Sequence, residues 1–459
     1  MLERLALYFE PKMRNTSVDP EKLHRFLSSK VVKRYLKKYV FLKLKQSITY
    51  AYTTSPFYHE LFQKSSLHPS DIKTFQDMQK IPLTSAADIL NPERFFSVPA
   101  SKFVKIFSSS GMTGKPKQIF FTKRDIDQLI SRNASGFRLF YGLGKGDRLR
   151  ISFDIGYREN DWGIRYCLEN VALYLGAMGV VTAHRLSAKD EYQLLIAYGV
   201  TMIIGTPSYL LNLTCDLEKN YDLRALHLKA LLVGAEPLPQ GVRKKLEAAW
   251  GTKVYQGYGL IEVGTSVAAE CRQQDGMHIT ETDVYLEVIN PQTGEILKDG
   301  KVGEIVCTTL GREGMPLLRY RTRDLGCILT ENCPCGLPLR RIKIKGRTDD
   351  ILVLGSGDKL APSVVDEVLL SLPSVCDYQL VLTRRKGKDH LTVFAQTTSQ
   401  APSMKQKIVN ALMTLPEISH GVHETKTIQN PEVKLVKPHT FAPSSIKAKR
   451  IIDKRRLYE

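Results

Sequence analysis

The sequence contains no hydrophobic run as long as a membrane-spanning helix requires, about 18 consecutive apolar residues. Its first segment, Met1 to Arg14, also lacks the apolar central region that is typical of a secretory signal peptide. The 459 residues include only eight cysteines, too few to indicate a disulfide-stapled fold, so a reducing compartment is expected. These absences predict a soluble, cytoplasmic protein without a membrane span.

Acidic residues are missing from Lys22 to Gln46, a segment with nine lysines or arginines in a chain of net charge +19. One interpretation is a solvated helical face, and the other is a surface for an anionic partner: nucleic acid, a phosphorylated cofactor or an acidic carrier protein. The sequence has no aromatic-basic signature of the RNA-recognition type, so nucleic acid is the least favoured of these partners.

The chain is long and apolar enough, at 43% hydrophobic residues, for two or three globular units. No internal repeat and no low-complexity segment is present. The first hundred residues predict helices, because apolar side chains at Val32, Tyr35, Tyr39 and Leu42 recur at helical spacing. From Phe103 onward, short apolar runs alternate with amphipathic segments, which is typical of an α/β core.

After residue 285 the pattern changes to β-like segments separated by turns, and a distinct C-terminal unit is expected near residue 347. That unit should hold strands at 351–354 and 378–383 and helices at 363–370 and 404–412. The predicted class is α/β: a large N-terminal domain with mixed sheets and a β-rich subdomain, plus a small mobile α+β C-terminal domain. The expected boundaries are 1–347 for the large domain (helical region 1–100, α/β core 103–285, β-rich part 286–346) and 348–459 for the small C-terminal domain.

One turn concentrates hydroxyls, glycines and lysines: Ser108-Ser109-Ser110-Gly111-Met112-Thr113-Gly114-Lys115-Pro116-Lys117. Such a loop can wrap polyphosphate, because glycines let backbone N–H groups point at phosphate oxygens while hydroxyls and lysine add donors and charge. The G-x-x-x-x-G-K-[ST] spacing of the Walker A loop is absent. Taken alone, the segment is equally compatible with a surface turn.

The loop resembles the phosphate loop of the adenylate-forming (acyl-CoA synthetase/AMP-binding) superfamily, and four more segments resemble its motifs in the same order. They are the adenine segment Gly234-Ala235-Glu236-Pro237, the GYGxTE-like Tyr255-Gln256-Gly257-Tyr258-Gly259-Leu260-Ile261-Glu262, the ribose motif Arg319-Tyr320-Arg321-Thr322-Arg323-Asp324-Leu325, and the hinge Gly346-Arg347-Thr348-Asp349-Asp350. Arg323 in place of the usual glycine, together with Thr206-Pro207-Ser208-Tyr209-Leu210 and Lys447-Ala448-Lys449-Arg450-Ile451-Ile452-Asp453, is similar to the phenylacetate-coenzyme A ligase family.

This resemblance implies ATP-dependent activation of a small carboxylic acid through an acyl-adenylate, followed by acyl transfer to a thiol. The acceptor would be coenzyme A or the pantetheine of an acidic carrier protein. An amide ligase with an amine acceptor and a catalytically weak nucleotide-binding protein are the alternatives. A homodimer is compatible with all of these.

The resemblance also implies roles for individual residues. Lys447 would lie over the α-phosphate, although Ile446 stands where the family has glycine, and Glu262 would contribute to binding Mg²⁺. The nucleotide would contact Ser109, Ser110, Gly111, Thr113, Gly114, Lys115, Gly234, Ala235, Glu236, Pro237, Tyr258, Gly259, Asp324 and Arg347. Asp349 and Asp350 would form the hinge, and the acid pocket would include Asp154, Tyr157, Gly205, Tyr209 and Gly257.

Four further residues, Cys271, His278, Cys333 and Cys335, offer the tetrahedral sulfur and nitrogen ligands that Zn²⁺ prefers. Four protein ligands would close the site, so the expected zinc is structural. Free core thiols are the alternative interpretation.

Overall fold

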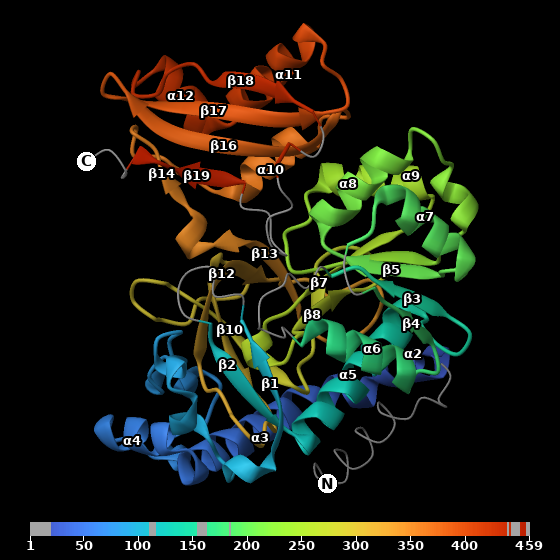
Figure 1. Cartoon of the computed structure of the whole chain (residues 1–459). Helices are drawn as coiled ribbons and strands as arrows, with labels where there is room; N and C mark the ends of the chain where they lie inside the picture. Colours follow the sequence, from blue (N-terminus) through green and yellow to red (C-terminus); the bar gives the residue numbers. More distant parts are fainter. Residues whose placement is uncertain are drawn as a thin grey trace. The chain divides into compact units, whose positions relative to one another are not determined.

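The protein is described by a computed structural model at residues 20–109, 116–153, 163–182, 185–437, 440–441 and 450–455. Two compact units are present (Figure 1). The first comprises Met1–Ile151, Tyr157–Val181 and Tyr255–Ile344, and the second comprises Ser152–Gly156, Thr182–Val254 and Lys345–Glu459. Within the described ranges, no helix is both long and apolar enough to cross a membrane.

The first unit contains five α-helices in the described part of the chain, and α3 and α5 begin at side-chain caps. They are α2 (Pro20–Leu27), α3 (Lys30–Thr54), α4 (Pro56–Lys64), α5 (Lys123–Tyr141) and α6 (Ile164–Tyr174). The Thr122 hydroxyl and the Asp125 carboxylate form a capping box at the start of α5, and the helix ends at Gly142, whose φ of 69° suits glycine. Helices α2, α3 and α4 lie within the first hundred residues, for which the sequence predicts helices.

The strands of the first unit form three groups. Strands β1 (Phe103–Ser108) and β2 (Gln118–Thr122) make an antiparallel pair, and β3 (Arg148–Ile151) runs parallel to β4 (Met178–Val180). The third group has the order β10-β11-β12-β13-β9-β8-β7. Its members are β7 (Val254–Tyr258), β8 (Ala268–Glu270), β9 (Met277–Ile279), β10 (Val284–Ile289), β11 (Gly303–Thr309), β12 (Tyr320–Ile328) and β13 (Arg341–Arg347).

A buried ion pair ties the N-terminal helical region to this β-rich group. The Arg319 guanidinium is 2% exposed, and its Nε lies 3.1 Å from the Glu287 carboxylate, which is fully buried. Its Nη1 donates to the Ile81 carbonyl at 2.7 Å. Burial raises the pKa of Glu287 above its ordinary value even though Arg319 lowers it, so the carboxylate depends on its partner.

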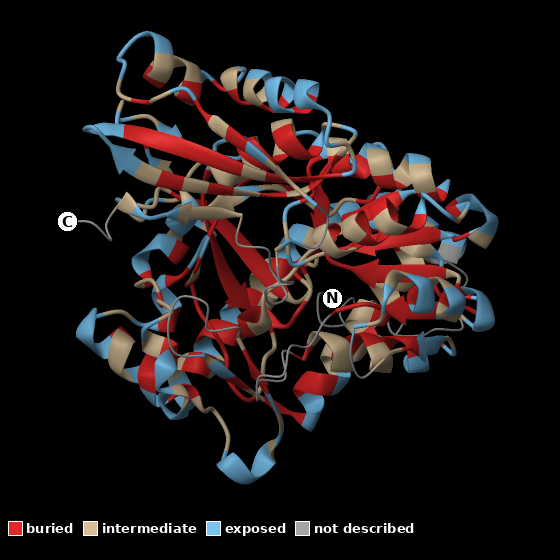
Figure 2. Cartoon of the chain, turned by 45° about the horizontal axis from the view of Figure 1, so that its top comes forward, coloured by how far each residue is buried: buried red, intermediate tan, exposed pale blue. Residues whose placement is uncertain are grey.

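The second unit contains a parallel pair, β5 (Met202–Gly205) and β6 (Ala230–Val233), with α7 (Ala188–Ala197), α8 (Pro207–Leu217) and α9 (Gln240–Trp250). Both strands are buried along their whole length, as expected for a parallel sheet covered by helices (Figure 2). The Trp250 indole donates to the Thr214 hydroxyl at 2.8 Å and links α9 to α8.

The C-terminal part of this unit is an α+β layer built on a four-stranded sheet with the order β18-β17-β16-β19. Its elements are β14 (Leu352–Val353), β15 (Lys359–Leu360), α10 (Pro362–Leu370), β16 (Val375–Arg385), β17 (Lys388–Thr397), α11 (Pro402–Met413), α12 (Pro416–His423), β18 (Glu432–Val436) and β19 (Ile451–Asp453). The strands and helices predicted here from sequence are confirmed, with β14, β16, α10 and α11 within a few residues of the expected bounds. The α/β class is confirmed as well.

Candidate active site

The turn rich in glycine and hydroxyl residues begins at the end of β1 and returns at the start of β2. Ser109 and Lys117, at the two ends of the turn, are joined by two hydrogen bonds. The Ser109 N–H donates to the Lys117 carbonyl, and the Lys117 N–H donates to the Ser109 hydroxyl, both at 2.9 Å. The predicted loop residues Ser110, Gly111, Thr113, Gly114 and Lys115 lie outside the described part of the chain. The described geometry therefore places the loop's two ends together.

A buried charge cluster forms around Glu262, which lies in the short turn Ile261–Val263 after β7. The Lys117 ammonium lies 2.6 Å from Glu262 Oε1, and the Tyr320 hydroxyl donates to the same oxygen at 3.0 Å. Lys117 Nζ also donates to the Tyr320 hydroxyl at 3.3 Å. Three segments far apart in sequence thus converge on one carboxylate oxygen.

The ionisation of Glu262 depends on this cluster. Burial is the largest single influence on its pKa and raises it, but the charge of Lys117 and the hydrogen bonds from Lys117 and Tyr320 outweigh burial. The pKa of Glu262 is therefore lowered, and the group is a carboxylate at neutral pH. An oxygen-rich anion of this kind suits a hard divalent cation.

Lys117 and Tyr320 are missing from the predicted site residues. Both stand inside segments that the sequence singles out, but nothing in the sequence indicates that their side chains meet at Glu262. The sequence offers one indication for Lys117, which is its place as a basic residue at the end of a loop suited to phosphate.

Asp324 and Tyr258 form a second pair, at 2.6 Å between the Tyr258 hydroxyl, which donates, and Asp324 Oδ2. Burial, followed by the charge of Asp324, raises the pKa of Tyr258 well above its ordinary value, so the hydroxyl keeps its proton. The Asp324 N–H in turn donates to the Thr322 hydroxyl at 3.0 Å, and that hydroxyl donates to the Ile305 carbonyl at 2.7 Å. The pair is thus held in a defined orientation on β12.

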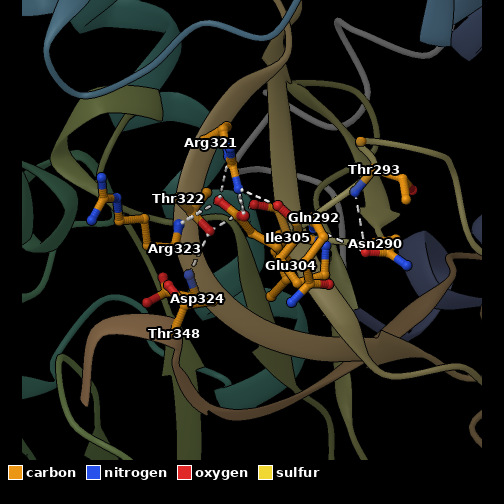
Figure 3. Close-up of polar contacts among 12 residues, drawn as sticks. Asn290, Gln292, Thr293, Glu304, Ile305, Arg321, Thr322, Arg323, Asp324 and Thr348 are labelled. Atoms are coloured by element: carbon orange, nitrogen blue, oxygen red, sulfur yellow. Dashed lines mark hydrogen bonds and ion pairs between the residues drawn. The ribbon is translucent and has the colours of Figure 1, made fainter. Parts of the chain in front are cut away.

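The backbone around Asp324 explains the unusual position of Arg323. Arg323 has a φ of 62°, in the left-handed region that favours glycine. Figure 3 shows the contacts that hold this bend: the Arg321 guanidinium binds both oxygens of the buried Glu304 carboxylate, and Glu304 also accepts from the Arg323 N–H at 3.2 Å. The surrounding structure stabilises a conformation that arginine alone would disfavour.

Close approach of the backbone accounts for the glycine at 259. A β-carbon on Gly259 would lie 1.5 Å from the Thr265 carbonyl oxygen, so no larger residue fits without movement of the backbone. Gly257 lies on β7, paired with Ala269 of β8. These glycines let the segment that carries Tyr258 and Glu262 turn tightly.

In the second unit, the structure brings together the predicted adenine segment and part of the predicted acid pocket. The Gly234 N–H donates to the Gly205 carbonyl at 3.1 Å, and the Glu236 carboxylate accepts from the Ser208 N–H at 3.2 Å. Ala235 has a φ of 67°, in the left-handed region, and Pro237 follows Glu236. Tyr209 packs near Gly205, with its Cδ1 3.3 Å from the place of a β-carbon there.

The remaining predicted residues fall in three places. Asp154, Tyr157 and the predicted catalytic Lys447 lie outside the described residues. Arg347 precedes the short turn Thr348–Asp350, which contains Asp349 and Asp350, and its guanidinium is 3.9 Å from the Asp349 carboxylate. Gly346, just before, has a φ of 136°, so the chain bends sharply at the predicted hinge.

Cys271, His278, Cys333 and Cys335 lie together in the first unit, with their ligand atoms all within 4.8 Å of one another. The Cys271 and Cys333 sulfurs are 3.7 Å apart, and Cys335 Sγ is 3.3 Å from His278 Nε2. His278 Nδ1 lies 3.2 Å from the Leu339 carbonyl, an arrangement that orients the ring and leaves Nε2 for a metal. The tertiary structure thus brings the four residues to one point, although they come from distant segments.

Comparison with known proteins shows that the chain belongs to the AMP-binding enzymes. Residues 41–311 match that family, and residues 357–455 match the AMP-binding enzyme C-terminal domain. It is 34% identical over 428 residues to a phenylacetate-coenzyme A ligase of Aromatoleum evansii, covering 90% of this chain and 93% of that one. A phenylacetate-coenzyme A ligase of Pseudomonas putida is 32% identical over 420 residues, with the same two coverages of 90% and 93%.

A solved structure of 2-hydroxyisobutyryl-CoA ligase in complex with 2-HIB-AMP shares the fold, with a TM-score of 0.80 and 23% identity over 92% of this chain and 90% of that chain. The predicted resemblance to the phenylacetate-coenzyme A ligase family is confirmed. The protein is accordingly an AMP-forming acid–thiol ligase that makes an acyl-adenylate and then a thioester.

Proposed function

We propose that the acid is a small carboxylic acid with an aromatic ring and that the thiol acceptor is coenzyme A. The observation that carries the proposal is the buried cluster of Lys117 and Tyr320 on Glu262, close in sequence to the Tyr258–Asp324 pair. Such an arrangement suits the gathering of anions around one phosphorus atom, where catalysis consists mainly of positioning and charge stabilisation.

In the first half-reaction, a carboxylate oxygen of the acid attacks the α-phosphorus of ATP, and the bond to pyrophosphate breaks. Glu262 would hold Mg²⁺, which neutralises phosphate oxygens when bound. The Lys117 ammonium, which is 2.6 Å from Glu262, would also contact a phosphate oxygen. Lys447 and the loop residues Ser110 to Lys115 would add the remaining positive charge and N–H donors.

The nucleoside is proposed to bind through the second pair. The Asp324 carboxylate, held by the Tyr258 hydroxyl at 2.6 Å, accepts hydrogen bonds from the ribose hydroxyls. Gly234 to Pro237 line the adenine, with Gly259 allowing close approach, and Arg347 contacts the nucleotide near the hinge. In the second half-reaction, after a change in conformation at Asp349 and Asp350, the thiol sulfur attacks the acyl carbon and the bond to AMP breaks.

The aromatic preference rests on the second unit. Tyr209 is one of the predicted acid-pocket residues, and the Arg185 guanidinium lies over its ring at 5.2 Å from the centroid. This part of the predicted pocket therefore has both an aromatic ring and a cation. An acid with a ring that carries a polar substituent fits such a pocket better than an aliphatic acid. Phenylacetate and its hydroxylated forms are therefore the first compounds to test.

Zinc is proposed as a structural ion at Cys271, His278, Cys333 and Cys335. The donor set supports this proposal: three sulfurs and one imidazole nitrogen whose ring is held by a backbone carbonyl, mostly buried, with no position left for substrate. These residues would join β8 and β9 to the segment before β13. Ligand softness disfavours the hard cations Mg²⁺ and Ca²⁺ at such a sulfur-rich site.

The test is acid-dependent exchange of pyrophosphate into ATP with phenylacetate, hydroxyphenylacetates, benzoate and a short aliphatic acid. The best acid is then assayed for AMP release with coenzyme A, with a pantetheinylated carrier protein and with a simple amine. Exchange with aromatic acids, followed by AMP release with coenzyme A, is the expected result. Exchange confined to the aliphatic acid, or AMP release only with the amine, would overturn the proposal.

A further inference from the structure

Helix α3, the long blue helix of Figure 1, carries a basic face on its first half. From Lys30 to Lys45 the exposed side chains are six cations and one apolar residue, and they are Lys30, Val31, Lys33, Arg34, Lys37, Lys38 and Lys45. At about 100° per residue the first five cations, Lys30 to Lys38, fall within roughly 140° of the helix circumference and extend about 12 Å along its axis. Farther along the helix the same sector holds the buried Leu44, so the basic face is a compact patch on the first half of α3, with Lys45 apart from it.

These charges are not balanced within the protein. Helix α3 contains no aspartate or glutamate, and in the described part of the chain none of the six cations forms an ion pair with a carboxylate. Two of them instead lie over aromatic rings: Arg34 over Tyr35 and Lys37 over Phe75, at 5.6 and 5.8 Å from the ring centroids. Those contacts keep the cations at the surface without neutralising them.

The buried side chains of α3 fix the helix in the protein core: two lie opposite the cations, and the others lie farther along the helix. Val32, Tyr39, Val40, Leu44 and Ile48 are buried, and all but Val32 and Tyr39 belong to the main core cluster of the first unit. The helix therefore cannot turn its apolar side toward another surface, as a free amphipathic helix would. Any partner of the basic face must be recognised through charge at the surface.

We infer that the basic face of α3 is a docking surface for the anionic phospholipid head groups of a membrane, which would hold this enzyme at a bilayer as a peripheral protein. The composition of the face favours this partner over a protein. Lysine, which supplies four of the five cations, is depleted in protein interfaces, whereas tyrosine, tryptophan and arginine supply most of their binding energy. Cationic side chains can bind a plane of lipid phosphates through charge alone.

Nucleic acid is disfavoured by the same composition. The face has no asparagine, glutamine or exposed aromatic side chain between Lys30 and Lys45 that could bind base edges or stack on a base. Val31, which is 53% exposed beside the cations of this face, would gain nothing from contact with a nucleic-acid phosphate backbone, but it can contact the interfacial region of a bilayer.

The experiment is sedimentation of the full chain with vesicles of phosphatidylcholine alone or of phosphatidylcholine with phosphatidylglycerol. We expect binding only to the anionic vesicles, weakening as salt shortens the Debye length from about 10 Å at 0.1 M. Each cation near the surface contributes about fivefold to partitioning, so the triple variant Lys33→Gln, Arg34→Gln, Lys37→Gln should bind about 100-fold more weakly.

A matched variant, Lys73→Gln, Lys298→Gln, Lys301→Gln, removes the same net charge from exposed positions outside α3. It should retain nearly all vesicle binding, and both variants should retain pyrophosphate exchange, which reports a folded enzyme. Equal losses in the two triple variants would refute a localised surface. Failure to bind anionic vesicles, or preference for a DNA duplex or an acidic protein over them in competition, would overturn the proposal.

Discussion

Replacing Lys117 with methionine isolates the contribution of the buried Lys117–Glu262 pair. The two charges lie 2.6 Å apart, which at an effective dielectric constant of about 20 corresponds to roughly 6 kcal/mol of gross attraction. Much of this is offset by desolvation, but removal of one partner leaves a buried charge unpaired, which costs about 3–5 kcal/mol. Because the Lys117 side chain is 22% exposed, we expect a loss near the lower end, about 3 kcal/mol, in the free energy of unfolding.

The structure supplies a control with the same chemistry at the surface. Lys64 and Glu60 are also 2.6 Å apart, but their side chains are 71% and 45% exposed. Lys64→Met should therefore change the free energy of unfolding far less than Lys117→Met, because solvent screens the exposed pair. Urea denaturation of both variants at neutral pH compares the two pairs directly, and similar losses would refute the claim that burial makes the difference.

The same comparison has a predicted pH dependence. The pKa of Glu262 in the folded protein is lowered, so the pair contributes stability that is complete above the unfolded value, about 4.3, and is lost as the pH falls through the folded value. In Lys117→Met the burial of Glu262 is no longer outweighed, so its pKa should rise and protonation should relieve the cost. The difference in free energy of unfolding between wild type and variant should thus begin to narrow above the unfolded value, as the pH falls through the variant's raised pKa, and should narrow further as the pH falls through the lowered pKa of the wild type. A difference that is constant with pH would contradict this account.

Three further predictions follow from other contacts. Arg319→Met leaves the Glu287 carboxylate buried without its cation and should cost about 3–5 kcal/mol in urea denaturation, whereas adding Glu287→Leu should recover most of that loss. Tyr258→Phe removes the 2.6 Å hydrogen bond to Asp324 and should raise the KM for ATP by about 10-fold or more, with a smaller change in kcat. Purified protein should contain about one zinc per chain, which Cys333→Ser removes; zinc-free wild-type protein would defeat the metal proposal.

Much of the fold could be predicted from sequence because the signals are local. Helical spacing through Val32 and Tyr39 predicts α3, and the fully apolar runs at Met202–Gly205 and Ala230–Val233 predict buried strands. The family could also be predicted, since its motifs are contiguous segments in a fixed order. The domain boundary at 347, the hinge at Asp349 and the cytoplasmic location stay predictions.

The sequence by itself determined the α/β class, the family and which segments carry polar side chains suited to a nucleotide, because each of these depends on residues near one another in the chain. Only the tertiary structure decided that Lys117 and Tyr320 meet at Glu262, and that four zinc-type ligands meet at one point. The contacts at Glu262 join residues 58 or more positions apart, and their energies depend on burial, which is a property of packing and not of any local pattern.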